Sequence, residues 1–354
     1  MNPLTSWLGK IARLLVALIG AAAAISGFAQ SAAESHRPAG ERRAVPAPPY
    51  VSPETPQGTG PYPAIMVADP TLPTHTLYRP KDIAAIGKEK LPVVAFANGA
   101  CINFGNSFRY FLSEIASHGF LAIATGPIGP REAEFSIVGF GQPAAGSPAA
   151  SLAAAGKLVS ATPASGPGPA YTTAKQLIDA IDWAEKENAR QGSAYFGKLD
   201  TARIAVMGMS CGGLQAIDAA HDARVKTLGV WNSGAYTDDR RAMEIAAAKA
   251  TKAGLKALRI PTIYVTGDLS DIAFANTEDD FSRIDAVPLF RAWREHTGHG
   301  GTYRELNGGA FGKVAVAWLR WQLKGDMSAA SMFTGADCGI CKQPEWHVKK
   351  KNIE

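Results

Sequence analysis

The sequence predicts an α/β protein in which a mostly parallel, doubly wound sheet is flanked by helices. Short apolar runs without polar alternation are typical of strands covered on both faces, and they occur at residues 93–97, 121–124, 204–207, 227–231 and 262–265. Segments with apolar residues at offsets of three, four and seven lie between several of these runs, as in amphipathic helices. The alternation of the two patterns favours parallel strands joined by helical crossovers.

The composition excludes several other classes of protein. The 354 residues are 46% apolar and 19% charged, which is too apolar and too weakly charged for an intrinsically disordered chain. A chain of this length buries a large core without a disulfide framework, and only four cysteines are present. The net charge is +5, and the basic run at 349–351 is short, so we expect no nucleic-acid partner.

The first 29 residues have the features of an export signal peptide. Lys10 and Arg13 precede an apolar run at 14–25, and small residues follow that run. The run is short for a membrane-spanning helix, although an uncleaved anchor is the alternative. We therefore expect a secreted or periplasmic protein that has no membrane attachment after signal cleavage.

The rest of the chain divides into three parts. Residues 30–63 are rich in proline, which blocks helices, so they are expected to form an extended lead-in. Residues 64–335 form the predicted α/β domain, in which the low-complexity segment 139–170 is expected to be a long surface loop. Residues 336–354 are expected to be a C-terminal tail that carries a Cys-x-x-Cys motif.

Local signals also place the main helices. We expect one helix after Ser107, a second after Thr172 or Thr173, and a third that ends at Gly325 as its C-cap. A further helix is expected beyond the strand at 262–265, with its acidic residues as surface charges; these are Asp279, Asp280 and Asp285.

The motif with the clearest chemical meaning is Gly-x-Ser-x-Gly at residues 208–212. It follows the strand predicted at 204–207 and precedes a predicted helix. A nucleophile at such a junction lies on a tight turn, where glycines on both sides let the strand and the helix approach without side-chain collisions. Ser210 is the only serine with both glycines, so it is the candidate nucleophile, with an ordinary glycine turn as the alternative.

A serine hydroxyl needs a base to remove its proton and a carboxylate to orient that base. The loop before the last predicted helix contains His299 between glycines, which makes it the favoured base, with His296 in reserve. Two acids compete in the loop after the strand at 262–265. We favour Asp271, because the apolar residues that follow would anchor it, and keep Asp268 in reserve.

An acyl-transfer site also needs two backbone amides that bind the developing oxyanion. The first is expected from Cys211, the residue after the nucleophile, which also begins a helix. The second is expected from the loop that follows the strand at 93–97, where Ala100 is the favoured donor and Cys101 is the next candidate.

These residues resemble those of the α/β-hydrolase superfamily over positions 91–325. The nearest likeness is to compact secreted esterases of the dienelactone-hydrolase, cutinase and polyester-hydrolase type. Asn98 stands where the oxyanion segment of such enzymes commonly has histidine. The resemblance implies an α/β-hydrolase fold and assigns substrate contacts to Trp231 and Met209; core packing is the alternative role for Trp231.

The lid and the cysteines complete the expectations. Only about 30 residues separate Trp231 from the strand at 262–265, which leaves no room for a large lid. In the expected fold, the loops of Cys101 and Cys211 come together, so a disulfide that fixes the oxyanion donors is one hypothesis and two free thiols are the other. Cys338 and Cys341 lack the second ligand pair of a zinc site, so we expect a local disulfide and no metal.

The sequence as a whole favours a secreted serine esterase that works through an acyl-enzyme. The expected substrate is a small or polymeric ester, no cofactor is expected, and the protein is expected to be a monomer. A peptidase or amidase on the same scaffold and a non-catalytic binding protein are the alternatives, and Cys211 as the nucleophile is a minor one.

Overall fold

The computed structural model describes residues 52–131, 171–236 and 250–354, which all lie in one compact unit, Val45–Glu354. The signal peptide predicted at 1–29 and the loop predicted at 139–170 lie outside the described residues. Because residues 237–249 also lie outside them, the expected absence of a large lid stays a prediction. In the described part of the chain, no helix combines the length and the apolar character that crossing a membrane requires.

The described residues form one nine-stranded sheet with the strand order β1-β2-β4-β3-β5-β6-β7-β8-β9. The strands are β1 (Ala64–Val67), β2 (His75–Pro80), β3 (Leu91–Ala97), β4 (Leu121–Thr125), β5 (Leu199–Met209), β6 (Val225–Trp231), β7 (Thr262–Gly267), β8 (Leu289–Arg294) and β9 (Trp346–Lys351). The six strands from β4 to β8 pair in parallel, whereas β1, β2 and β9 pair antiparallel at the two edges. The predicted α/β class with a mostly parallel sheet is therefore confirmed.

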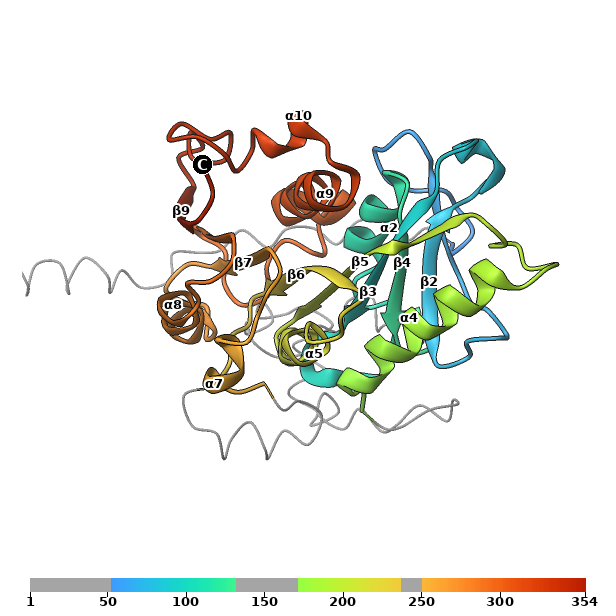
Figure 1. The fold of residues 1–354 in the computed structure, drawn as a ribbon, viewed down its shortest axis with the longest axis horizontal. Coiled ribbons are helices and arrows are strands. Elements are labelled where there is room, and N and C mark those ends of the chain that lie inside the picture. The colour runs from blue at the N-terminus through green and yellow to red at the C-terminus, as the bar shows by residue number, and fades with distance from the viewer. Residues whose placement is uncertain (1–51, 132–170, 237–249) are drawn as a thin grey trace, which may run out of the picture. The chain divides into compact units, whose positions relative to one another are not determined.

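The helices cover both faces of this sheet (Figure 1). The α-helices are α2 (Arg109–Ser117), α4 (Ala174–Ala189), α5 (Cys211–Ala219), α7 (Lys252–Leu255), α8 (Phe274–Arg283), α9 (Gly309–Lys324) and α10 (Met327–Ala330), and the short 3-10 turns are η1 (Ala84–Ile86), η2 (Gly99–Cys101) and η4 (Leu306–Gly308). Helices α4 and α5 lie on one face, and α2 and α9 lie on the other. Each face therefore has its own buried core.

The ends of three helices test the predicted caps. Helix α4 begins after Thr173, whose amide donates to Gln176 Oε1 at 3.0 Å, and α9 ends at Gly325 in a left-handed conformation with φ 68°. Both of these boundaries confirm the predictions. Helix α2 begins one residue later than expected, with Phe108 as its N-cap, because the Ser107 hydroxyl donates to the carbonyl of Phe104.

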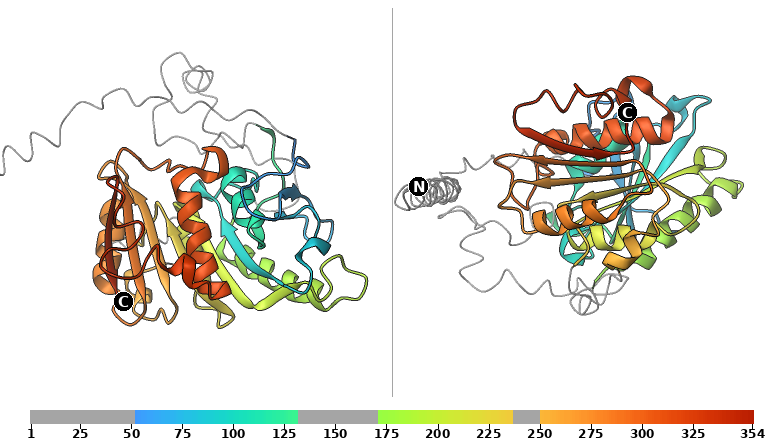
Figure 2. Two further views of the ribbon diagram at one scale, coloured as in Figure 1. Left: turned by 90° about the horizontal axis from the view of Figure 1, so that it is seen from above. Right: turned by 60° about the vertical axis from the view of Figure 1, so that its left-hand side comes forward.

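The two ends of the described chain are more ordered than the sequence suggested. Strand β9 lies within the expected C-terminal tail and pairs with β8 along the sheet edge, as both views of Figure 2 show in red. Near the other end, the amide of Thr59 in the lead-in donates to the Glu114 carboxylate on α2 at 2.8 Å. The folded domain therefore extends beyond the limits predicted at 64 and 335.

The strand order places a reversal between β3 and β5. The chain runs from β3 to β4 on one side and then returns past β3 to β5 on the other. In open α/β sheets, the loops at the carboxyl ends of such strands diverge and leave a crevice that binds ligands. The loop after β3 and the turn after β5 therefore mark the expected position of a site.

Candidate active site

Ser210 lies between β5 and α5 in a backbone conformation that few residues adopt. Its φ is 52° and its ψ is −120°, and it serves as the N-cap of α5. A non-glycine residue with such angles costs about 1–3 kcal/mol and persists only where its surroundings impose it. Here the Ser210 amide donates to the Trp231 carbonyl at 2.9 Å, and the Ser233 hydroxyl donates to the Ser210 carbonyl at 2.6 Å.

The glycines around Ser210 are required by close backbone contacts. A Cβ at Gly208 would overlap the carbonyl of Gly212, and a Cβ at Gly212 would overlap the carbonyl of Ala97 on β3. A Cβ at Gly213 would overlap the side chain of Ser233. The spacing of the motif thus lets α5 start directly against the ends of β3 and β5.

Gly212→Ala is expected to destabilise the folded protein by about 3 kcal/mol or more, because the backbone at Ala97 cannot move without disturbing the sheet. Gly300→Ala is the matched control, since a Cβ there meets no atom within 4 Å. Chemical denaturation of both variants measures the difference. Equal stabilities for the two variants would contradict the packing argument.

Ser210, His299 and Asp271 form one chain of hydrogen bonds. His299 Nε2 lies 2.9 Å from Ser210 Oγ, and His299 Nδ1 lies 2.6 Å from Asp271 Oδ1. His299 and Asp271 are each only 3% exposed, whereas Ser210 is half-buried. The structure thus brings together the three residues that the sequence favoured as nucleophile, base and acid.

The Asp271 carboxylate is held from several sides. Besides the contact with His299, its oxygens accept hydrogen bonds from the amides of Gly267 and Ala273 at 3.0 and 2.9 Å. Burial favours the neutral carboxyl, but the hydrogen bonds and the charge of His299 outweigh it, so the pKa of Asp271 lies below its usual value of 3.8. Asp271 is therefore ionised at neutral pH and suited to orient an imidazole.

The two reserve residues lie elsewhere. Asp268 accepts hydrogen bonds from the amide and the hydroxyl of Ser270, two residues later, and so caps its own turn. The side chain of His296 is 91% exposed and lies 4.0 Å from Glu295. Neither residue is part of the hydrogen-bonded chain at Ser210.

Asn232 is a residue of the site that the sequence did not reveal. It directly follows β6, and its Nδ2 donates to Asp271 Oδ2 at 2.7 Å. Its Oδ1 accepts from the buried Tyr303 hydroxyl at 2.5 Å, and its φ of 41° lies in the left-handed region that asparagine tolerates. Its place at the carboxyl end of the strand beside β5 is the one signal that could have identified it.

Asn232→Ala is expected to lower kcat about tenfold and the free energy of unfolding by about 1–3 kcal/mol, because Asp271 loses a donor and Tyr303 an acceptor. Tyr303→Phe is the matched control, since it removes only the contact with Asn232. Steady-state kinetics and thermal unfolding of the two variants measure the effects. An Asn232→Ala variant with wild-type kcat would exclude a role for this residue in positioning Asp271.

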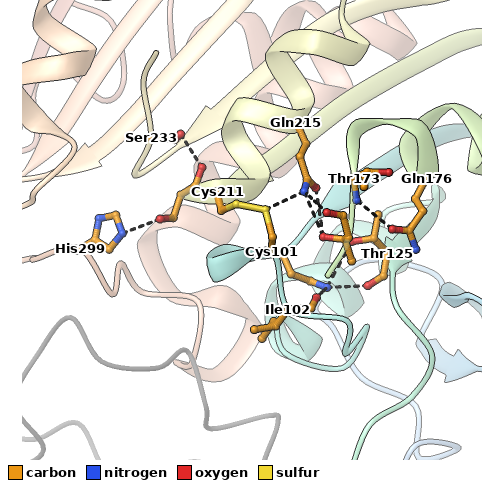
Figure 3. The surroundings of a disulfide bond; sticks show 12 residues. Cys101, Ile102, Thr125, Thr173, Gln176, Cys211, Gln215, Ser233 and His299 are labelled. Atoms are coloured by element: carbon orange, nitrogen blue, oxygen red, sulfur yellow. Dashed lines mark hydrogen bonds between the residues drawn. A yellow bond between two sulfur atoms is a disulfide. The ribbon is translucent and has the colours of Figure 1, made fainter. Parts of the chain in front are cut away.

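The predicted oxyanion donors lie on two segments joined by a disulfide. Cys211 is the first residue of α5, where backbone amides have no acceptor within the helix. Ala100 lies in η2, which follows β3 after Asn98. Its neighbour Cys101 is bonded to Cys211, with their Cα atoms 5.3 Å apart. Figure 3 shows His299 on one side of this bond and Gln215 on the other.

The two expected substrate contacts lie in the core. Trp231 is fully buried and packs edge-on against Phe111, with ring centroids 5.2 Å apart, and Met209 is 1% exposed. The prediction that they contact substrate is therefore corrected to core packing. Both follow from strand alternation, which turns the last side chains of β5 and β6 towards the α2 and α9 face.

The second cysteine pair is separate from this site. Cys338 and Cys341 form a local disulfide beyond α10, as predicted. Over the described ranges, no cluster of three or more His, Cys, Asp or Glu residues is arranged to hold a metal ion.

The sequence comparisons do not assign the chain to a family. No protein-family model matches the sequence, and no curated protein matches it significantly. The function is therefore inferred from the geometry of the site.

Proposed function

We propose that this protein is an α/β-hydrolase-fold serine esterase that cleaves carboxylic esters through an acyl-enzyme. The observation that carries the proposal is the hydrogen-bonded chain from Ser210 through His299 to Asp271. Ser210 lies on a strained turn between a central strand and a helix, which is the position that a nucleophile elbow gives its serine.

Each of the three residues has a distinct task. His299 Nε2 accepts the proton of Ser210 as its oxygen attacks the ester carbonyl, and His299 then donates that proton to the leaving alcohol. Asp271 stays ionised, holds the Nδ1 proton of His299 and stabilises the imidazolium that forms. Water then attacks the acyl-enzyme as His299 accepts one of its protons. The bond from the acyl carbon to Ser210 Oγ breaks as His299 returns that proton to the serine oxygen, and the carboxylic acid is released.

The tetrahedral intermediate carries a negative charge on the former carbonyl oxygen. In this proposal the amides of Cys211 and Ala100 donate hydrogen bonds to that oxygen, and the N-terminus of α5 adds its partial positive charge. Removing one such donor typically costs about 100-fold to 1000-fold in kcat.

The proposed location is outside the reducing cytoplasm. Both cysteine pairs of the chain are disulfide-bonded, which suits a secreted or periplasmic enzyme. The positive start and the apolar run at 1–29 support the same location.

A panel of p-nitrophenyl esters and p-nitroanilides with matched acyl groups tests the reaction class. We expect turnover of the esters and, because an amine is a poorer leaving group, at most weak turnover of the anilides. Comparable kcat/KM values for both series would replace the esterase by an amidase. No turnover of any ester by the folded protein would contradict the proposal and favour a binding protein.

A further inference from the structure

The loop that carries the second proposed oxyanion donor has an unusual backbone. Ala100 and Cys101 both have positive φ values, 52° and 50°. A non-glycine residue in that region is strained and persists only where the surrounding structure holds it there. Two such residues in succession therefore need strong restraints, and the contacts of the loop show what these are.

One set of restraints acts on the base of the loop. Asn98, which is fully buried, donates from Nδ2 to the carbonyl of Thr125 at 2.6 Å and to the carbonyl of Ile102 at 3.1 Å. These bonds fix the entry and the exit of the loop against β4. They do not join it to the turn that carries Ser210.

A second set of restraints joins the loop to α5. The Cys101–Cys211 disulfide is covalent, and Cys211 is the residue next to the nucleophile. Gln215, one turn further along α5 and fully buried, donates from Nε2 to Cys101 Sγ and to the Thr172 carbonyl, both at 2.8 Å (Figure 3). The Thr172 amide in turn donates to the Cys101 carbonyl at 2.9 Å.

We propose that the Cys101–Cys211 disulfide, supported by Gln215, positions the two oxyanion donors, so that turnover depends on this disulfide being oxidised. This inference rests on the proposed esterase function. Cys101, Cys211 and Gln215 act here through the amides of Ala100 and Cys211 as positioning residues.

Bond geometry gives the size of the effect. A disulfide holds two sulfur atoms about 2 Å apart, whereas two unbonded heavy atoms in contact stand about 3.5 Å apart. Reduction therefore separates the loop from the turn by about 1 Å or more, and a misplacement of about 1 Å costs on the order of 100-fold in rate. The loss falls on kcat, because the oxyanion exists only in the transition state and the intermediate.

The reduction step follows ordinary thiol–disulfide exchange with a dithiol such as dithiothreitol. Its thiolate attacks Cys211 Sγ, the bond to Cys101 breaks, and Cys101 leaves as a thiolate that the Gln215 amide stabilises. The second dithiothreitol thiol then displaces Cys211, so the reductant becomes a cyclic disulfide. Two electrons and two protons are transferred to the two cysteines.

The test compares kcat and KM on a p-nitrophenyl ester before and after dithiothreitol treatment of the full chain. We expect kcat to fall about 100-fold with KM changed less than about threefold, and reoxidation to restore kcat. The Cys338→Ser/Cys341→Ser variant is the matched control, because it lacks the other disulfide and should behave as wild type in both states. Alkylation and peptide mapping of the reduced protein identify which cysteines are free thiols.

Cys101→Ala/Cys211→Ala keeps both backbone amides and should show the lower kcat without any response to dithiothreitol. If this variant does not fold, the reduced wild-type protein still gives the result. Gln215→Leu adds a readout specific to the sulfur contact. The ratio of reduced to oxidised dithiothreitol at half-inactivation should rise about tenfold, because the Cys101 thiolate loses its donor.

Two negative results have different meanings. In the first, Ser210 reacts with a fluorophosphonate, and esters turn over equally fast whether Cys101 and Cys211 are joined by the disulfide or are free thiols. That result overturns the positioning role and leaves the esterase proposal standing. If the oxidised protein shows neither reaction, both proposals are overturned.

Discussion

Ser210→Ala is expected to lower kcat for ester hydrolysis by about 10⁴-fold or more, because no other group on the hydrogen-bonded chain can form the acyl-enzyme. The fold should persist, because the substitution removes a single oxygen atom and its 2.9 Å hydrogen bond with His299 Nε2. Initial rates and thermal unfolding measured on the same samples separate the two effects.

Ser331→Ala is the matched control for this variant. Ser331 is exposed and its hydroxyl donates only to the nearby Ser328 carbonyl, so its rate should stay within about twofold of wild type. A Ser210→Ala variant with substantial remaining turnover would mean that another nucleophile does the chemistry. Cys211 could be that nucleophile only in the reduced protein, because its sulfur is bonded to Cys101 in the disulfide.

Asp271→Asn is expected to lower kcat by about 10⁴-fold at neutral pH, because an amide no longer fixes the His299 tautomer that accepts the serine proton. Asp268→Asn should retain nearly the wild-type rate, since Asp268 caps the turn at Ser270 instead. The two variants differ from wild type by the same chemical change three residues apart. Steady-state kinetics of both distinguishes the two acids.

The reverse pattern, with loss of activity in Asp268→Asn and retention in Asp271→Asn, would contradict the assignment of the acid. It would require the loop after β7 to rearrange when substrate binds. Circular dichroism of both variants checks that each is folded before the rates are compared.

The sequence could predict the site where the geometry leaves few alternatives. A nucleophile turn needs small residues at fixed positions, because the backbone of Gly212 lies against Ala97. These small residues are close neighbours in the sequence, so the motif can be recognised without a structure. The histidine loop can be predicted for a related reason, since the order of the elements places it after β8 and before α9.

Contacts between distant segments could not be predicted in the same way. Asp268 and Asp271 differ in their hydrogen-bond partners. The partners of Asp271, Asn232 and His299, are distant in the sequence and reach it only in the folded chain. A single asparagine after a strand has no periodic signal. The choice between the two acids was therefore open from sequence alone.

Buried charge was the other source of error. Asp280 was expected on the surface, but it is fully buried on α8 and paired with Lys252 at 2.5 Å. Burial raises its pKa to about 6, against the opposing effect of Lys252. Its partner Lys252 lies on another helix, α7, so the sequence of α8 alone could not show that a carboxylate at this position is paired and buried.

Strand β9 was missed because lysines hide its periodicity. Its residues include three consecutive lysines, yet Trp346 is 6% exposed and packs on the core of the α9 face. Lysine stems cover apolar surface while their charged ends reach acids, as Lys351 does with Asp285 at 2.6 Å. Lysines on an edge strand also prevent pairing with other chains.

The proposed active site is tested most directly by locating the covalent adduct of a serine-reactive phosphonate. The oxidised wild-type protein is treated with a fluorophosphonate, and the adduct is mapped by mass spectrometry of its peptides. We predict one adduct per chain, on Ser210, which Ser210→Ala and His299→Ala both lose. Absence of an adduct on folded protein, or an adduct on another residue, would contradict the proposed active site.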